Sequence, residues 1–598
     1  MTKEQETLRS ADVLWIALAV ALLAGLAEVG VRLLQHNIFG GRVWVSQHFV
    51  WMGPVSLAAL TMVAALALVA GSRILRRAVP VRVALAVFIF LGIAGPMLSV
   101  GRLHRAAMLI VALGIAVQSA RLLSARSRFI RKHARPAAVA SSAVVLLLAG
   151  FIFGRQALAE RRGLAALPPS TGDAPNVLLI ILDTVRAASM SVYGYHHPTT
   201  PNLEEIAAEG TVFEHAWSTS PWTLPSHSSI FTGRFAHELS ADLVTPLDET
   251  FPTVAEHFRD RGYVTAGFAA NLLYTTREVG LSRGFVHYDD YPLSAAVLAT
   301  SSSLGRLLAG QVAAALGSDQ KLVRRSGESM TNTFLSWARQ PRDRPFFAFI
   351  NYFDAHAPYL PPDSLAGRFG PRRSGRALHD LSNREHWTAA EIDAERAAYD
   401  EVLADLDGQL GRLFDGMREL GMLDNTIVLI SSDHGEQFGE HGLMDHGNSL
   451  YRPLLEVPLI IRFPARVPAG ERISTPVSLR DIAVTLVDLA DQHPSPFPGT
   501  PLSSLWSGGE QPPSPVLSEV REGIRTVPWL PLAKGDMQSL VADDHHYIRD
   551  GAGTEEVYHI DDVAEASDLS HETDVVLSLR SLIARLVGET YSGSAAGH

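Results

Sequence analysis

The chain has 598 residues, a formal net charge of −11 and a hydrophobic fraction of 47%. Acidic and basic residues are mixed through its second half, so there is no basic stripe of the kind that follows a nucleic acid, and nucleic acid is excluded as an expected partner. The chain contains no cysteine, which excludes disulfides, thiolate nucleophiles and cysteine metal ligands. Any metal ion must therefore be held by oxygen atoms and imidazoles.

Five apolar runs predict a transmembrane region over residues 1–155. They lie at 13–31, 49–70, 83–100, 106–117 and 137–153. Most of them approach the roughly 20 residues needed to cross the hydrocarbon core of a bilayer. The fourth run is short unless it extends to Leu123, and five is the favoured count. A cleavable signal peptide explains the first run less well, because further apolar runs follow it.

The loops between these runs differ in positive charge, which predicts their orientation. Arginine and lysine are concentrated between runs two and three and between runs four and five. Short cytoplasmic loops hold an excess of these residues, so both loops and the N-terminus are expected in the cytoplasm. An odd number of spans then places everything after Phe153 outside the cytoplasm. Glu28, inside the first run, is expected to be an interface residue near the outer end of the span, and a functional intramembrane carboxylate is the alternative.

The second half predicts an α/β layered fold. A cluster of proline, glycine and serine closes a linker over 156–175. Residues 176–182 then form a continuous apolar run, typical of a strand buried on both faces of a parallel sheet. The pattern returns at 345–353 and 426–431, and residues 389–420 between them have helical apolar spacing. Strands that alternate with helices indicate the α/β class.

Weaker sequence patterns predict the remaining boundaries in the second half of the chain. The segment 292–326 is rich in alanine, serine and leucine and is expected to be a helical insertion. Short apolar stretches within 539–560 are separated by a glycine turn, which predicts a small antiparallel sheet. We therefore expect a catalytic domain over 176–530 and a C-terminal subdomain and tail over 531–598. His545 and His546 belong to no motif and are expected to be solvated.

Acidic and imidazole groups follow two of the predicted strands. Asp183 ends the first of them, and Asp433 and His434 follow the strand at 426–431. Loops at the carboxyl ends of parallel strands meet at one edge of a sheet, where such groups can bind a divalent cation. Either aspartate alone could instead cap a helix. Their joint occurrence with Asp-His-Gly predicts a metal site.

The segment 220–233 supplies the candidate nucleophile. It contains Thr223 between two prolines. A hydroxyl held on a metal ion loses its proton more readily and attacks at neutral pH. A threonine in a proline-bounded turn is the alternative interpretation. We expect Thr223 to act as nucleophile and as a fourth ligand beside Asp183, Asp433 and His434.

Four motifs in this order resemble the sulfatase family, within the alkaline phosphatase superfamily. They are Asp183-Thr-Val-Arg186, Thr223-Leu-Pro-Ser-His227, Asp354-Ala-His-Ala-Pro-Tyr359 and Ser432-Asp-His-Gly-Glu-Gln-Phe-Gly-Glu-His-Gly442. The resemblance runs from about Asn176 to the region of Tyr547. It implies an alkaline phosphatase-like layered fold with a central, mostly parallel sheet and a small C-terminal antiparallel subdomain. It also implies a divalent metal ion, whether zinc, manganese or calcium.

The resemblance implies roles for further residues. It makes Asp183, Asp433 and His434 metal ligands and places Thr223 in the nucleophile slot. His356 takes the place of a histidine that contacts the oxygens of the transferred group, and His446 that of a residue serving the leaving group or the anion. We expect His227 and Asn271 to hold nonbridging oxygens with His356. Glu440 and His441 could complete a second metal site; surface solvation or a supporting role is the other interpretation.

The chain also departs from the sulfatase pattern. Sulfatases have cysteine or serine in the nucleophile slot, later oxidised to formylglycine, and an arginine four residues on. Here these positions hold Thr223 and His227, and threonine does not form formylglycine. The second aspartate of the family's pair is Thr184. The family's Lys-Trp-His segment is missing, with residues 267–271 in its expected place.

An unmodified threonine resembles the phosphodiesterase and phosphotransferase branches of the superfamily. We therefore expect a membrane-anchored hydrolase of phosphate or sulfate esters, acting outside the cytoplasm on a small-molecule, lipid or envelope polymer ester. A phosphoglycerol or phosphoethanolamine transferase is the alternative, because such membrane enzymes share the plan of five spans and an outer domain. A catalytically silent, membrane-tethered binding protein is a third possibility, against which the retained Thr223 and its ligand set argue.

Overall fold

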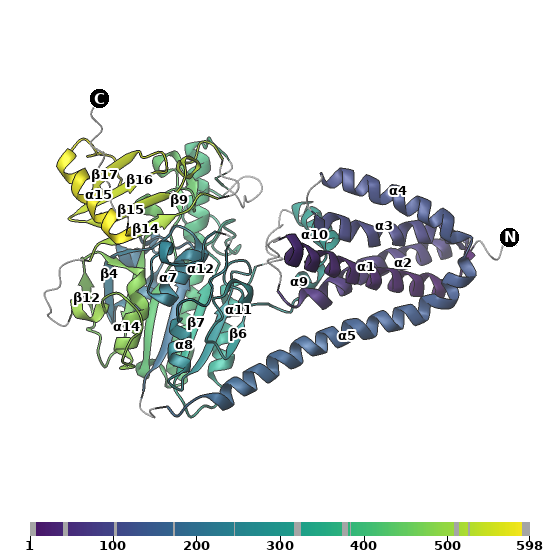
Figure 1. Cartoon of the computed structure of the whole chain (residues 1–598), viewed down its shortest axis with the longest axis horizontal. Coiled ribbons are helices and arrows are strands. Elements are labelled where there is room, and N and C mark those ends of the chain that lie inside the picture. Colours follow the sequence, from purple (N-terminus) through teal and green to yellow (C-terminus); the bar gives the residue numbers. More distant parts are fainter. Residues whose placement is uncertain are drawn as a thin grey trace. The chain divides into compact units, whose positions relative to one another are not determined.

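The computed structural model of the chain describes residues 7–39, 46–100, 104–170, 174–243, 245–315, 324–372, 381–382, 384–506, 514–523 and 527–588. The chain divides into two compact units (Figure 1). The first comprises residues 1–162 and 292–323, and the second comprises 163–291 and 324–598. The insertion at 292–323 therefore belongs to the first unit although the residues on both sides of it belong to the second.

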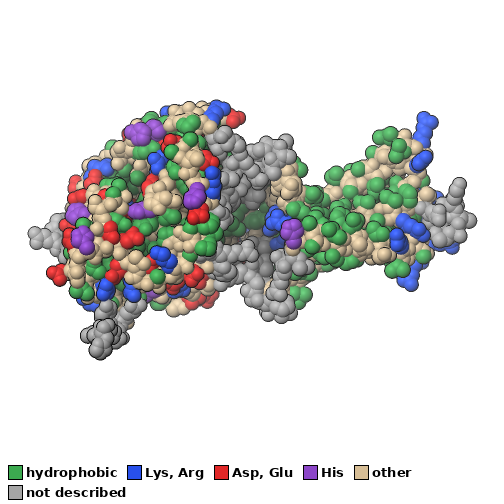
Figure 2. Space-filling model, turned by 90° about the horizontal axis from the view of Figure 1, so that it is seen from above, with side chains coloured by type: hydrophobic (Ala, Val, Ile, Leu, Met, Phe, Trp, Pro, Cys, Tyr) green, Lys and Arg blue, Asp and Glu red, His purple; other side chains and the backbone are tan. Residues whose placement is uncertain are grey.

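Five long apolar helices make up most of the first unit. They are α1 (Ser10–Phe39), α2 (Phe49–Ile74), α3 (Val81–Val100), α4 (Arg105–Ser124) and α5 (Ser127–Ala166), with a short strand pair β1 (Thr7–Leu8) and β2 (Val79–Pro80). All five are long and apolar enough to cross a membrane. Hydrophobic side chains cover much of the visible face of this unit (Figure 2), which suits lipid contact. Helix α5 continues through residues 156–166, where the sequence suggested a linker.

The insertion is helical, as predicted, and packs on these helices. It forms α9 (Ala295–Thr300) and α10 (Ser303–Ala315). Both helices contact α2, and α10 also contacts α3. Leu304 is buried in one cluster with Leu22, Leu57 and Ala94. The insertion thus adds to the core of the first unit.

Polar side chains of the long helices also contact the insertion. Glu28 is only 1% exposed, and its Oε1 accepts from the backbone N of Ser303 at 2.8 Å and from Arg32 Nη2 at 3.3 Å. Ser56 Oγ donates to the carbonyl oxygen of Ala299 at 2.9 Å. The Glu28 carboxylate is thus buried by a partner far along the chain, while its depth in the membrane stays a prediction.

A sheet of nine strands forms the centre of the second unit. Its order is β12-β4-β11-β8-β3-β7-β5-β6, with β13 beside β4. The strands are β3 (Asn176–Leu182), β4 (Thr211–Trp217), β5 (Val264–Ala269), β6 (His287–Asp289), β7 (Phe346–Tyr352), β8 (Thr426–Ser431), β11 (Glu456–Arg462), β12 (Glu471–Ile473) and β13 (Val477–Ser478). Strands β8, β3, β7, β5 and β6 run parallel, whereas β11 is antiparallel to both its neighbours. The three predicted strands are confirmed.

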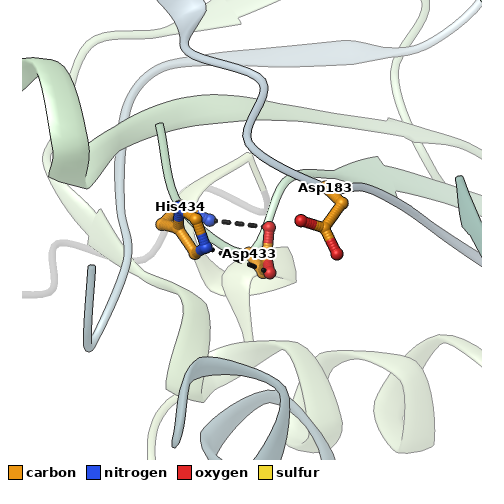
Figure 3. A group of neighbouring side chains, drawn as sticks. All are labelled: Asp183, Asp433 and His434. Carbon is orange, nitrogen blue, oxygen red and sulfur yellow. Dashed lines mark hydrogen bonds and ion pairs between the residues drawn. The ribbon is translucent and has the colours of Figure 1, made fainter. Parts of the chain in front are cut away.

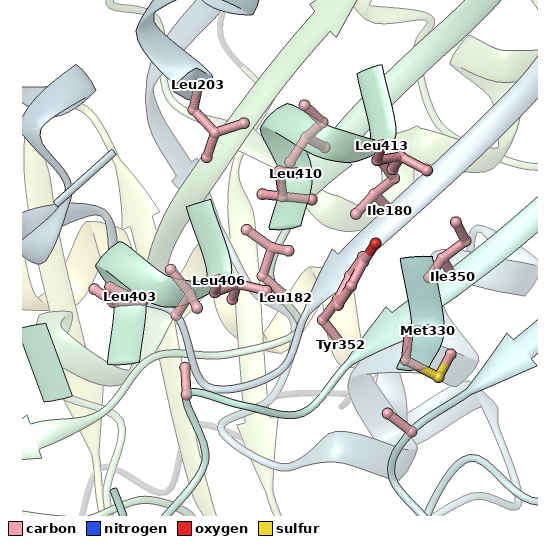
Figure 4. Close-up of a cluster of buried hydrophobic side chains, with 14 of the residues drawn as sticks. Ile180, Leu182, Leu203, Met330, Ile350, Tyr352, Leu403, Leu406, Leu410 and Leu413 are labelled. Atoms are coloured by element: carbon pink, nitrogen blue, oxygen red, sulfur yellow. The ribbon is translucent and has the colours of Figure 1, made fainter. Parts of the chain in front are cut away.

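Helices cover both faces of this sheet, which explains the continuous apolar runs. The helices of this unit are α6 (Pro201–Ala208), α7 (Thr223–Thr232), α8 (Val254–Arg259), α11 (Gly327–Ala338), α12 (Ala389–Glu419), α13 (Arg452–Leu455) and α14 (Ile482–Leu489). On one face, Ile180 and Leu182 of β3 pack against Leu406 and Leu410 of α12 (Figure 4). Alternate residues face the other side, where Phe347 stacks on Phe258 of α8. Each buried leucine or isoleucine contributes roughly 1.5–3 kcal/mol.

The C-terminal part adds a second sheet, antiparallel and of four strands. Its order is β14 (Val516–Val520), β15 (Met537–Ala542), β16 (His545–Arg549) and β17 (Glu555–His559), followed by α15 (Thr573–Val587). Asp543 and Asp544 have φ of 48° and 61°, so they form a two-residue hairpin turn that divides 539–546 into two strands. His546 is buried, with its Nδ1 2.6 Å from Glu565 Oε1, so the prediction that it is solvated is wrong.

Candidate active site

Three of the predicted metal ligands meet at the carboxyl edge of the central sheet. Asp183 follows β3 directly, and Asp433 and His434 follow β8 after one residue. Their side chains are fully buried and face one another (Figure 3), and one ligand atom from each lies within 4.8 Å of the others. The register places Ile181 beside Ser431, so the two strands end level with each other.

The two aspartates are held by further hydrogen bonds. Asp183 Oδ2 accepts from Nδ2 of Asn271 at 3.0 Å and from Nδ2 of Asn351 at 3.3 Å. Asp433 Oδ1 accepts from the backbone N of Thr184 at 3.2 Å and of His434 at 3.0 Å. The second oxygen of each carboxylate is buried and has no hydrogen-bond partner among the described residues. Each aspartate therefore keeps one oxygen available.

Electrostatics supports a cation in this position. Burial raises the pKa of Asp183 well above its ordinary value, and the neighbouring Asp433 raises it further. Burial likewise raises the pKa of Asp433 and lowers that of His434 well below its ordinary range. Two buried carboxylates with spare oxygens and a neutral imidazole form a donor set that fits a divalent cation. The residues present thus fit the metal ion that the family implies.

Thr223 joins this group from the start of α7. It is the first residue of the helix, is 2% exposed, and its Oγ1 lies 3.4 Å from Nε2 of His434. The helix is tied to the metal ligands, because Ser226 Oγ donates to the carbonyl oxygen of Asp433 at 2.6 Å and Ser218 Oγ donates to the same oxygen. The structure therefore brings the predicted nucleophile and the predicted ligands together.

His227 lies one turn further along α7. Its Nδ1 is 2.8 Å from the carbonyl oxygen of Thr223 and 3.5 Å from Oδ2 of Asp433. Its Nε2 is buried and has no hydrogen-bond partner among the described residues. Burial lowers the pKa of His227, with Asp433 acting in the opposite direction. His227 therefore presents a nitrogen without a hydrogen-bond partner one helical turn from Thr223.

His446 lies between two carboxylates. Its Nδ1 is 3.0 Å from Oε1 of Glu436 and 3.1 Å from Oδ1 of Asp445. Burial alone would lower the pKa of His446, but Glu436 and Asp445 outweigh burial and raise this pKa well above its ordinary value. The ring lies with its centroid 4.5 Å from that of His434. Glu436 and Asp445 thus favour the protonated form of His446 beside the ligand group.

His356 borders the same space from the loop after β7. Its ring centroid is 4.8 Å from that of His446, and its Nδ1 donates to the carbonyl oxygen of Ala357 at 2.8 Å. Arg324 supports this loop by donating to the carbonyl oxygens of Phe353 at 3.1 Å and of His356. Burial lowers the pKa of Arg324 to about 10, against the attraction of Asp354 and Asp183. The sequence did not predict a role for Arg324, because the residues next to it in the chain form no motif.

Asn271 lies beside the predicted ligands, but its amide is engaged by Asp183. Its partner Asn351 also escaped the sequence analysis. It is the only polar residue apart from Tyr352 in the buried run Phe346–Tyr352. An asparagine inside an otherwise apolar strand was the feature of the sequence that could have pointed to a role for Asn351.

Glu440 and His441 do not build a second metal site. Glu440 Oε1 pairs with Arg186 Nη1 at 2.8 Å and with Arg396 Nη2 at 3.3 Å. His441 Nε2 lies 3.0 Å from Oε2 of Glu565, and its ring stacks on Tyr451. Both side chains are committed to structural contacts. The second cluster of ligand-type side chains among the described residues is Glu436, Asp445 and His446.

A sequence model of the sulfatase family matches residues 175–492, more than half of the chain. The chain belongs to the sulfatase family. The match spans both parts of the second unit and the insertion between them, and it contains every site residue described above. Membership of this family makes the chain an ester hydrolase, and its fold is of the alkaline phosphatase type, as predicted.

Relatives and solved structures agree with this assignment. The uncharacterized sulfatase YidJ of Escherichia coli (strain K12) is 28% identical over 357 residues, 54% of this chain and 70% of the relative. Arylsulfatase K of Homo sapiens is 26% identical over 388 residues, 57% and 70% of the two chains. The phosphonate monoester hydrolase of Agrobacterium radiobacter matches with a TM-score of 0.54 at 20% identity, over 69% of this chain and 96% of that one. The structure of BT4656 with D-glucosamine-2-N,6-O-disulfate matches with a TM-score of 0.56 at 19% identity, over 71% and 100%.

Proposed function

We propose that this sulfatase-family member is a membrane-anchored hydrolase that cleaves sulfate or phosphate esters by attack of Thr223. The main support is the position of the Thr223 hydroxyl. It lies at the start of α7, and its Oγ1 is 3.4 Å from Nε2 of His434 in the buried ligand group. No cysteine exists anywhere in the chain, and the slot residue is a threonine. An unmodified hydroxyl is then the nucleophile.

The reaction proceeds in two displacements. Thr223 Oγ1, after losing its proton to solvent, attacks the sulfur or phosphorus centre, and a new bond to Oγ1 forms as the bond to the leaving oxygen breaks. His446 gives its proton to the leaving oxygen, which departs as an alcohol. Water then attacks the same centre, His446 takes up the water proton, and sulfate or phosphate leaves as Thr223 is restored.

The ligand group prepares Thr223 for this attack. Asp183, Asp433 and His434, together with Thr223, would hold the divalent cation. A zinc, manganese or calcium ion bound there would lower the pKa of the hydroxyl and offset charge on the ester oxygens. His356 would contact the nonbridging oxygens. Neutral His227 donates its Nδ1 proton to the carbonyl oxygen of Thr223 and presents Nε2 as an acceptor, so it does not donate to these oxygens. Asn271 acts indirectly, because its side-chain amide donates a hydrogen bond that orients Asp183.

Membrane anchoring and substrate class follow from separate features. The five apolar helices and the arginine-rich loops support an anchor in the membrane, with the second unit outside the cytoplasm. The relatives and structural neighbours include arylsulfatases, an N-acetylglucosamine-6-O-sulfatase and an ulvan-active sulfatase. A sulfated small molecule or glycan is the substrate class that these names favour. Analysis of the released product separates hydrolysis from transfer to an acceptor alcohol.

The experiment compares Thr223→Ala with the wild type on p-nitrophenyl sulfate, p-nitrophenyl phosphate and the corresponding phosphodiester. Loss of the attacking group should lower kcat on the best ester by about 10³-fold or more. Thr232→Ala is the matched control, because this threonine lies at the other end of α7 and its hydroxyl bonds only to the carbonyl oxygen of Ser228. Full activity of Thr223→Ala would remove Thr223 from the mechanism.

A further inference from the structure

One end of the first unit carries a dense group of cations. The segments 7–12, 73–82 and 121–135 contain eleven arginine and lysine residues and a single carboxylate, that of Asp12. They comprise β1 with the start of α1, the connection from α2 to α3 and the connection from α4 to α5. Figure 2 shows Lys and Arg side chains, in blue, gathered at one end of this unit. We call these three segments the basic surface.

Contacts between the three segments join them into one surface. The short strands β1 and β2 pair with each other. Arg131 of α5 donates a hydrogen bond to the carbonyl oxygen of Thr7, in β1. Arg82 Nε, near the start of α3, donates to Ser124 Oγ at the end of α4 at 3.2 Å. The N-terminal segment and both connections therefore hold their cations side by side.

The charge of this surface is directed to the surroundings. All of its arginine and lysine residues except Arg131 are exposed. One carboxylate does not neutralise eleven cations, and like charges at this density raise the local concentration of anions. The basic surface is therefore suited to a partner that carries several negative charges.

Exposed apolar side chains lie among these cations. Ile74, Leu75, Leu122 and Phe129 are 62–80% exposed, and each is next to an arginine in the chain. A nucleic acid or an acidic protein would pair with the cations and leave the apolar side chains in water. The headgroup region of a bilayer suits both kinds, because acyl chains cover the apolar groups while phosphates meet the cations.

Helix α5 places two of the cations at the depth of lipid phosphates in the proposed membrane. Its apolar run begins at residue 137, and a rise of about 1.5 Å per residue puts Arg135 and Lys132 roughly 3–8 Å before that run. The headgroup region is about 5–8 Å thick on each side of the hydrocarbon core. Cζ of Arg135 also lies 5.7 Å from the ring centroid of Trp15, and tryptophan is enriched at this level of a membrane.

We propose that the basic surface binds phospholipids with anionic headgroups in preference to zwitterionic ones. The cations contact the headgroups, and the exposed apolar side chains contact the upper part of the acyl chains. Each arginine or lysine close to an anionic membrane surface contributes about 5-fold to the affinity. The inference goes beyond the proposed function, because it concerns the first unit and does not depend on Thr223.

Lipid retention by the detergent-solubilised full-length protein tests the proposal. The protein is mixed with equal amounts of dioleoyl phosphatidylglycerol and dioleoyl phosphatidylcholine, and the bound lipids are counted by native mass spectrometry. The wild type should retain phosphatidylglycerol at least about 10-fold more than phosphatidylcholine. The preference should shrink when the ammonium acetate concentration rises from about 0.1 M to about 1 M, because salt screens exposed charges.

A pair of double variants locates the effect. Arg126→Gln with Lys132→Gln removes two exposed cations that take no part in the contacts between the segments, and it should lower the preference at least about 5-fold. Arg161→Gln with Arg162→Gln is the matched control. It removes two exposed cations near the other end of α5, and it should keep the wild-type preference.

Three outcomes would overturn the inference. The first is equal retention of the two lipids by the wild type. The second is an unchanged preference in the Arg126 and Lys132 variant, or an equal loss in both double variants, since total charge would then select the lipid. The third is binding of polyglutamate in the same detergent without any preference for phosphatidylglycerol, which would indicate a soluble polyanion as the partner.

Discussion

At the scale of single residues, the site depends on placing two buried carboxylates side by side. Asp183 and Asp433 are both fully buried, and burial raises the pKa of each. Leaving a buried charge uncompensated costs several kcal/mol. Amide and backbone donors hold one oxygen of each carboxylate, which directs the other oxygen to a cation. The hydrogen-bond donors around Asp183 and Asp433 are therefore expected to be as necessary for cation binding as the two carboxylates.

Asn351 tests this argument, because its amide serves the site from inside a buried strand. Its Nδ2 donates to Asp183, and its Oδ1 accepts from the backbone N of Asn271 at 2.9 Å. Asn351→Leu keeps the volume and removes both contacts. We expect metal affinity, measured by competition with a chelator, to fall about 10- to 100-fold. Asn332→Leu, at an exposed position of α11, is the control; equal metal affinity of the Asn351 variant and the wild type would refute the supporting role.

At the scale of elements, the parts of the fold that the sequence predicts are those whose pattern is local. Strands β3, β7 and β8 are mostly apolar because helices cover both faces, and α12 begins at a capping box of Thr388 and Glu391. Asp183, Asp433 and His434 could be predicted because they follow such strands. The supporting residues Asn351, Glu436, Asp445 and Arg324 could not, since their roles arise from contacts between distant segments.

The insertion at 292–323 also has contacts that the sequence does not predict. Its helices were predictable from composition, but its place on the long helices was not, because the contacts join residues more than 240 positions apart. Glu28 stands out in the sequence only as a charge in an apolar run. Its partners, Arg32 and the backbone of Ser303, become visible only in the structure. A polar group buried among apolar helices is stable when such partners are present.

Removing the Glu28 carboxylate should loosen the insertion. In Glu28→Leu, Ser303 N and Arg32 lose an acceptor, so α9 and α10 should open more often. We expect faster tryptic cleavage after the exposed Arg306 in membranes, with Glu28→Gln less affected because it keeps an acceptor oxygen. Ser99→Ala is the control, because that hydroxyl bonds only within its own helix. Cleavage at the wild-type rate in Glu28→Leu would show that the contact does not hold the insertion.

At the scale of the whole molecule, the proposed catalytic residues and the proposed membrane helices belong to different units of one chain. The ligand group lies in the second unit, whereas the five apolar helices lie in the first. The chain crosses between the units after residues 162, 291 and 323. The proposed catalytic unit and the proposed membrane anchor are therefore different compact units that the chain joins by three crossings.

The central claim is that Thr223 forms a covalent ester with the transferred group, and mass spectrometry tests it most directly. The protein is mixed with its best ester, quenched in acid within the first turnovers and digested. The account predicts that the peptide containing Thr223 carries one sulfuryl or phosphoryl group, that fragmentation places this group on Thr223, and that Thr223→Ala carries none. Modification of another residue in an active protein, with Thr223 unmodified, would contradict it.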